Sequence, residues 1–259
     1  MPDLSTIQII LTVLIFVWSG FVRSGLGFGG AIFTLPFLLL VDNDPLFFLP
    51  IISTHLLFFA GITLGREQWK KFRNKSRTNF TEPTINWWFI RYSLPIMLAP
   101  KIIGVIGLLI LPIDLMNIII FTLIAGYGIT YITDREMRSH NAVMDIIFLA
   151  IGAYISGTSL LGGPLIIAVA LRYIKPQEYR STLFVIWFFL VSIKMVAFAA
   201  AGIDLQFYYA LLLLPFAGIG HYLGLIFHER LLNQNDRGFY TTIGWILLIT
   251  SCAGIAQNM

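Results

Sequence analysis

The stretch SGLGFGG at residues 24–30 has a counterpart, SGTSLLGG, at residues 156–163. The Ser-Gly pairs that open the two stretches match, and so do the Gly-Gly pairs that close them. An apolar run precedes and follows each stretch. Self-similarity of this kind indicates two related halves of one chain, and it constrains the fold before any other signal is considered.

Composition places the whole chain in a membrane. Of its 259 residues, 58% are hydrophobic and only 12% are charged, about half of the roughly 25% charged residues of a soluble domain. The mean hydropathy is +0.83, and long apolar runs recur too often for one buried core to absorb them. A water-soluble protein is therefore excluded. Because the runs lack the two-residue alternation of a membrane barrel, they predict helices.

We predict ten helical segments that divide into five and five. They cover residues 7–22, 28–41, 46–64, 92–112, 115–133, 141–157, 162–174, 182–203, 205–227 and 239–257. The expected fold is an all-α polytopic membrane protein. Its first transmembrane repeat covers residues 1–133, and its second covers residues 134–259.

Positive charge predicts the orientation of these segments. Apart from three residues inside apolar segments, all Lys and Arg residues fall in four loops, residues 65–91, 134–140, 172–181 and 228–238. The opposite loops contain no Lys or Arg, and their charged residues are Asp42, Asp44, Asp114 and Asp204. The positive-inside rule then places both termini outside the cytoplasmic (inner) membrane. Because the net charge of +4 arises in these short loops, it indicates orientation and not a nucleic-acid partner.

An odd number of segments in each half turns the second half upside down relative to the first, so we expect an inverted repeat. The first two segments of each half are short and reach only about 21 to 26 Å, against a hydrocarbon core of about 30 Å. We expect two hairpins, or broken helices, whose glycine-rich tips meet inside the membrane. The alternative is two pairs of short tilted helices with turns outside the membrane.

Three cations are predicted to lie within the membrane: Arg23 at the tip of the first hairpin, Lys101 near the middle of the fourth segment, and Lys194 near the middle of the eighth. A lone cation there costs at least about 2.5 to 3.5 kcal/mol, so such residues normally face a cavity and have a partner. Asp145 is the only acid within a predicted segment, which leaves a surplus of positive charge. The surplus predicts a small anionic substrate. The alternatives are snorkelling to the membrane surface and pairing with carbonyls at helix ends.

The glycine pairs predict an anion cradle. Gly29-Gly30 and Gly162-Gly163 fall where the second segment of each half begins, and the free N–H groups and positive dipole of a helix start favour an anion. Hydroxyls beside them can donate to oxyanion oxygens. The predicted substrate-binding residues are Arg23, Ser24, Gly29, Gly30, Lys101, Thr158, Ser159, Gly162, Gly163 and Lys194, with Ser156 as a further donor.

Other residues suggest a coupling role or exclude other classes. His55 and Asp145 are candidates for proton coupling, as is His221; the alternative is that each histidine is a hydrogen-bonded core or interfacial residue. The single cysteine, Cys252, allows neither an intrachain disulfide nor a cysteine metal cage. No HExxH, P-loop or Gly-x-Ser-x-Gly motif is present, which argues against a membrane protease or an ATP-driven pump. We therefore expect no enzyme, cofactor or metal.

The sequence GLGFGG at residues 25–30 followed by Pro36, together with SGTSLLGGP at residues 156–164, resembles the duplicated signature of the TauE/SafE sulfite exporter family. The resemblance extends to chain length, to the two similar halves and to the long basic loop of the first half, so it covers essentially the whole chain. It implies an integral membrane permease that acts as a secondary carrier of sulfite, sulfoacetate, other sulfonates or organic anions.

The leading hypothesis is a transporter that moves a small sulfur-containing or organic anion by alternating access, embedded in the lipid bilayer. An anion channel, with the same charges along a continuous pore, is the alternative. A membrane-embedded enzyme or assembly factor is a third hypothesis, and it requires paired carboxylates or a metal cluster within the membrane. Homo-oligomerisation stays open.

Overall fold

The computed structural model describes residues 4–26, 30–74, 85–134, 137–232 and 237–259, and the regular elements in these ranges are all helices. There are ten of them: α1 (Thr6–Leu26), α2 (Leu35–Val41), α3 (Pro45–Asn74), α4 (Trp87–Ile110), α5 (Ile113–Thr133), α6 (Ala142–Ser159), α7 (Gly163–Tyr173), α8 (Pro176–Ala200), α9 (Phe207–Leu232) and α10 (Arg237–Gln257). The predicted all-helical fold is confirmed.

Seven helices, α1, α3, α4, α5, α6, α8 and α9, are long and apolar enough to cross a membrane. Many of their large side chains point outward, as Ile102, Ile103 and Ile106 do on α4, which suits a lipid surface. By contrast, α7 has 11 residues and α2 has 7. At 1.5 Å per residue they reach about 16 and 10 Å, too little to cross a core of about 30 Å.

Most helix boundaries agree with the predicted segments to within about five residues. However, α3 continues to Asn74, past the predicted end at residue 64, and α8 begins at Pro176, before the predicted start at residue 182. The second segment was expected to be helical from residue 28, but residues 30–34 form a turn and α2 begins only at Leu35. Glycine disfavours a helix interior, whereas Pro36 fits the first helical turn. The prediction that Gly30 starts a helix is therefore wrong, and Gly29 lies outside the described residues.

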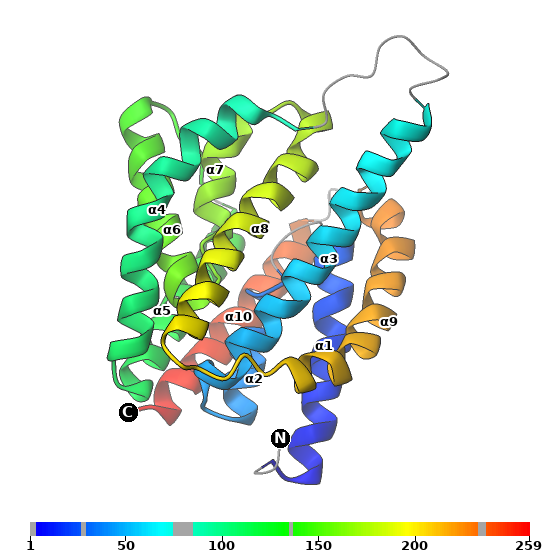
Figure 1. Cartoon of the computed structure of the whole chain (residues 1–259). Helices are drawn as coiled ribbons and strands as arrows, with labels where there is room; N and C mark the ends of the chain where they lie inside the picture. Colours follow the sequence, from blue (N-terminus) through cyan, green and yellow to red (C-terminus); the bar gives the residue numbers. More distant parts are fainter. Residues whose placement is uncertain (1–3, 27–29, 75–84, 135–136, 233–236) are drawn as a thin grey trace.

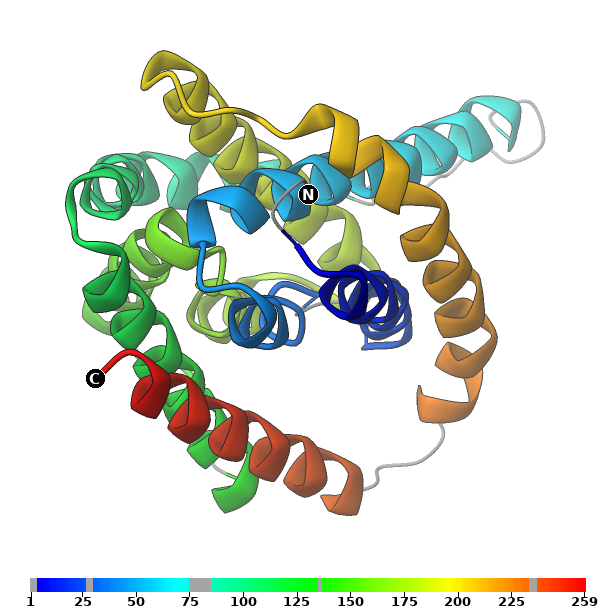
Figure 2. The same ribbon diagram turned by 90° about the horizontal axis from the view of Figure 1, so that it is seen from below.

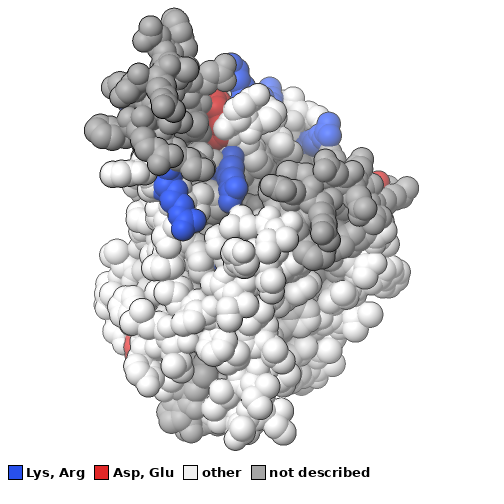
Figure 3. All heavy atoms as spheres, turned by 90° about the vertical axis from the view of Figure 1, so that its right-hand side faces the viewer, with Lys and Arg blue, Asp and Glu red and all other residues white. Residues whose placement is uncertain are grey.

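Each short helix lies near one end of the molecule. Figure 1 shows α2 at the lower end, where both chain termini also lie, and α7 toward the opposite end. Seen from the end with the termini, α1 and α2 lie toward the middle, with α10, α5, α9 and α3 around them (Figure 2). Lys and Arg gather at the upper end of the face in Figure 3, above a broad uncharged surface. The orientation of the termini across a membrane stays a prediction.

Close helix crossings organise the packing. The most extensive pairs are α1 with α9, α5 with α10, α4 with α6, and α3 with α8. Where α4 crosses α6, a Cβ added to Gly104 would lie 2.2 Å from the carbonyl oxygen of Tyr154, and one added to Gly157 would lie 2.5 Å from that of Lys101. Glycine at these positions lets the two backbones touch, as is common between membrane helices.

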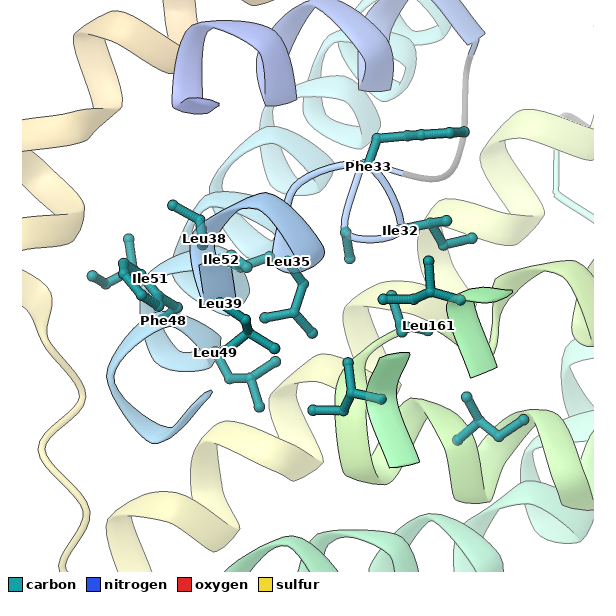
Figure 4. Packing of buried hydrophobic residues seen from close by; sticks show 14 of the residues in the cluster. Ile32, Phe33, Leu35, Leu38, Leu39, Phe48, Leu49, Ile51, Ile52 and Leu161 are labelled. Atoms are coloured by element: carbon teal, nitrogen blue, oxygen red, sulfur yellow. The ribbon is translucent and has the colours of Figure 1, made fainter. Parts of the chain in front are cut away.

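A buried apolar cluster surrounds α2 and joins the two tips. Leu35, Leu38 and Leu39 of α2 are fully buried, and the cluster also contains Ile32 of the turn before α2 and Leu161 of the α6–α7 connection. In Figure 4 the Ile32 and Leu161 side chains lie near each other between the two connections. The tip of the first short pair therefore packs close to the tip of the second, and this contact positions the site.

Candidate anion-binding site

A cavity lies between the two tips. Its volume is about 620 Å³, a value that includes space open to the outside. Its wall is formed by residues from both short pairs and from α3 and α8: Arg23, Gly30, Ala31, Ile32, Leu56, Ser156, Leu160, Gly163, Ile167, Phe184, Trp187 and Val191. Its lining, which is apolar with a few polar groups, resembles that of a small-molecule site.

Arg23 is the charged side chain in this wall. It lies in the last turn of α1 rather than in a loop, and only 7% of it is exposed. Its guanidinium carbon lies 3.8 Å from the ring centre of Phe59 on α3. Its Nε and Nη2 atoms are buried and have no hydrogen-bond partner among the described residues. An arginine that is buried and unpaired is costly, and an oxyanion would satisfy both nitrogens.

Gly30 makes room for this arginine. A Cβ added to Gly30 would lie 3.1 Å from the Cβ of Arg23, so the turn before α2 packs directly on the arginine stem. The predicted role of Gly30 as a helix start is replaced by a packing role, although Gly30 does line the cavity.

Lys101 and Lys194 are fully buried but point to backbone carbonyls. The Lys101 Nζ atom donates to the carbonyl oxygen of Ser156 at 2.8 Å and to its Oγ atom at 3.0 Å. Lys194 donates to the carbonyl oxygen of Thr158 at 3.1 Å, and its Nζ atom lies 5.4 Å from the ring centre of Phe198. Both therefore bind the last turn of α6, where free carbonyls and the helix dipole favour a cation. Neither lines the cavity.

The hydroxyl groups near the tips differ in what they can offer. Thr158 and Ser159 each donate to the carbonyl oxygen of Ile155, at 2.9 and 3.0 Å, so their protons are already used. The Ser24 hydroxyl hydrogen-bonds to Nδ1 of His221 on α9. Ser156 lines the cavity and accepts from Lys101, and its own proton has no acceptor among the described residues. It is the hydroxyl best placed to donate to a ligand.

The α6–α7 connection brings a helix start to the cavity. As predicted, α7 begins at Gly163, with Gly162 as its N-cap and proline in its first turn, and Gly163 lines the cavity. Gly162 packs so tightly that an added Cβ would lie 1.8 Å from the Gly152 carbonyl oxygen. Before it, Leu160 has a φ of 64°, a left-handed conformation that is costly for leucine and that tends to occur at ligand sites.

Two of the three candidates for proton coupling, His55 and Asp145, are not among the residues of the cavity wall. His55 is buried on α3, and its Nε2 atom hydrogen-bonds to the carbonyl oxygen of Ala210 at 2.7 Å. Asp145, in the first turn of α6, forms an ion pair with Arg172 at 2.8 Å and accepts from Ser139 and from the Tyr173 hydroxyl at 2.5 Å. Since Asp145 has its own cation, it leaves the three membrane cations uncompensated.

A family model described as sulfite exporter TauE/SafE matches residues 12–253. The chain belongs to the sulfite exporter TauE/SafE family. The predicted resemblance is confirmed, and membership makes the protein a membrane transporter of sulfite or related anions. Transport by this family agrees with the expectation that the protein is not an enzyme. No curated protein and no solved structure matches the chain.

The apolar residues that line the cavity of this TauE/SafE transporter were not predicted from its sequence. Phe184, Trp187 and Val191 lie on one face of α8, and Leu56 faces them from α3. Their spacing of three and four residues marks one side of a helix, but every membrane helix has such faces, so the sequence gives no signal that singles them out. Among the described residues, no group of three or more His, Cys, Asp or Glu side chains is placed to hold a metal ion.

Proposed function

We propose that the protein is a secondary transporter that moves a small anion of the sulfite or sulfonate class across the cytoplasmic membrane by alternating access. The observation that carries this proposal is the buried Arg23 at the wall of a cavity between the two tips, where its Nε and Nη2 atoms have no hydrogen-bond partner in the described part of the chain. Arg23 binds the anion directly. The Ser156 hydroxyl and the Gly163 amide complete the cradle.

An inverted repeat of residues 1–133 and 134–259 supports alternating access. In such a repeat each helix of the first half corresponds to one of the second half: α1 to α6, α2 to α7, α3 to α8, α4 to α9 and α5 to α10. The packing of α1 on α9 then corresponds to that of α6 on α4, and the packing of α3 on α9 corresponds to that of α8 on α4. In the pairs α3 with α8 and α5 with α10, each helix packs on its own counterpart. Four contacts have no counterpart among the more extensive contacts of the other half: those of α2 with α5, α2 with α10, α6 with α8, and α5 with α6.

Side chains repeat the same relation. Lys101 on α4 bonds to Ser156 of α6, while His221 on α9 bonds to Ser24 of α1. The two serines are the matching residues of the repeated stretches, and Lys101 and His221 each follow a proline of their helix by six residues. With five helices in each half, such a relation requires opposite orientations. Two inverted halves around one site are the usual design of a carrier.

The positions of the other cations favour a carrier over a channel. A cationic pore needs its charges along the conduction path, whereas Lys101 and Lys194 bind the end of α6 behind the cavity wall. In this proposal they hold the α6 tip in place. His55 and Asp145 remain predicted coupling residues, and their hydrogen bonds give both a structural role as well.

The proposal is tested by replacing Arg23 with methionine. We expect Arg23→Met to abolish uptake of sulfite and small sulfonates into proteoliposomes, because two charge-assisted hydrogen bonds of about 1.5 to 3 kcal/mol each are lost. The matched control is Arg91→Met, which removes the same charge from an exposed position on α4. Wild-type uptake by Arg23→Met would refute the assignment. Flux that is ohmic and independent of any ion gradient would favour a channel instead.

A further inference from the structure

The cavity wall carries more information than the presence of an anion site. Among the described residues that line it, Arg23 is the one with a charged side chain. The two nitrogens without partners, Nε and Nη2, belong to the same edge of the guanidinium, and their N–H bonds run parallel. This edge binds two oxygens of one carboxylate or sulfonate group side by side. The site therefore offers one positive charge and one pair of donors that can bind two oxygens of the same head group.

The rest of the wall is apolar. Trp187, Phe184 and Val191 of α8 form one side, and Ile167 of α7 and Leu56 of α3 add to it. A small inorganic anion would leave these surfaces without a partner, whereas an organic substituent would bury its own carbon surface against them. Each buried methylene contributes about 0.8 kcal/mol to binding.

A second negative charge would find no second cation among the wall residues that the structure describes. Lys101 and Lys194, the other two buried cations, donate to the carbonyls of Ser156 and Thr158. Beyond Arg23, the groups that remain are neutral donors, the Ser156 hydroxyl and the Gly163 amide. Burying a charge without a counter-ion costs several kcal/mol. The wall therefore discriminates against dianions.

We propose that the substrate is an amphipathic monoanion: a sulfonate or carboxylate head bound to the Nε–Nη2 edge of Arg23, with a hydrocarbon body packed on Trp187 and Phe184. Small dianions such as sulfate are poor ligands. This inference deepens the proposed function of the same site and rests on it for the claim that the bound molecule is transported, but its binding preference can be measured without transport.

The test is a binding series on the purified full-length protein, using methanesulfonate, propanesulfonate, benzenesulfonate and sulfate, with propanoate and butanoate as the carboxylate pair. We expect Kd to fall about fourfold for each added methylene, and therefore about fifteenfold from methanesulfonate to propanesulfonate. Sulfate should bind more weakly than propanesulfonate. A Kd that does not change with chain length, or sulfate binding tighter than propanesulfonate, would overturn the inference.

Variants assign the preference to this wall. Trp187→Leu should flatten the chain-length dependence, whereas Trp245→Leu, at an exposed position on α10, should keep the full dependence. Phe184→Leu is the second variant should Trp187→Leu fail to fold. A chain-length dependence that survives both Trp187→Leu and Phe184→Leu would place the apolar body elsewhere and refute the site.

Transport assays separate the two proposals. Uptake of sulfite in proteoliposomes together with binding that ignores chain length would uphold the proposed function and overturn this inference. Chain-length-dependent binding that requires Arg23, without transport of any member of the series, would uphold the monoanion site and overturn the transport proposal.

Discussion

The contact between α4 and α6 makes Gly104→Ala the most informative stability variant. The new methyl group would lie 2.2 Å from the carbonyl oxygen of Tyr154 and 3.1 Å from the Cα atom of Gly157. Since ordinary contacts of a Cβ atom begin at about 3.4 Å, the helices must separate by about 1 Å. Both close atoms belong to backbone, so no side-chain rotation can relieve the clash.

The separation has two costs. Overpacking of this kind costs about 1 to 3 kcal/mol. It also pulls the Lys101 Nζ atom away from the Ser156 carbonyl oxygen, now at 2.8 Å, and a hydrogen bond from a charged group is worth about 1.5 to 3 kcal/mol. Together they predict a loss of about 3 to 5 kcal/mol in the free energy of unfolding. At about 2 to 4 °C per kcal/mol, Tm falls by about 10 °C.

The assay is thermal unfolding in detergent, followed by the loss of the monodisperse peak on size exclusion. Gly126→Ala on α5 is the control, because a Cβ added there meets nothing within 4 Å and alanine favours the helix. We expect Gly126→Ala to match or exceed the wild-type Tm. A Gly104→Ala protein as stable as this control would refute the claim that α4 and α6 are held at backbone contact by glycine.

Three further predictions concern other contacts. Asp145→Asn removes the charge that pairs with Arg172, and we expect it to lower Tm by a few degrees, equivalent to about 1 to 3 kcal/mol; an unchanged Tm would show that the pair adds nothing. Phe59→Leu removes the ring that contacts the Arg23 guanidinium, a cation–π interaction worth about 0.5 to 2 kcal/mol. KM for the anion should therefore rise about two- to thirtyfold with kcat unchanged. The control Phe58→Leu, at an exposed position, should leave KM as it is. Met259→Cys, at a fully exposed position and in a background without the native thiol, should react with a membrane-impermeant maleimide in intact cells, since the charge pattern places the C-terminus outside. Protection there with reaction only after lysis would reverse the predicted topology.

The helices themselves were largely predictable from sequence, because a continuous apolar run in lipid has few options other than a helix. The exception, residues 30–34, shows the limit of that reasoning. Glycine is compatible with a helix start, a turn or a close contact, so a Gly-Gly pair predicts a special backbone position without saying which. The structure makes Gly30 a contact for Arg23 and makes Gly162 both an N-cap and a contact for Gly152.

The charged residues show a second limit. Lys101 and Lys194 lie in predicted apolar segments and Arg23 lies at the predicted tip between two of them, so burial was expected for all three, and all three are buried. Their partners do not follow, because backbone carbonyls are present at every residue and only the fold decides which ones a lysine can reach. In the same way, Arg172 counts as a loop charge in the sequence, yet it reaches Asp145 across the start of α6.

The way α6 is fastened has a mechanical consequence. Its first turn is tied to Arg172 of α7 by an ion pair, and its last turn is tied to Lys101 and Lys194. The last turn of α1, by comparison, has a neutral bond from Ser24 to His221. Because charged contacts hold both ends of α6, we expect thermal motion to be larger in α1 and α2 than in α6 and α7. The stiff half would then serve as the frame, and the softer half as the part that swings.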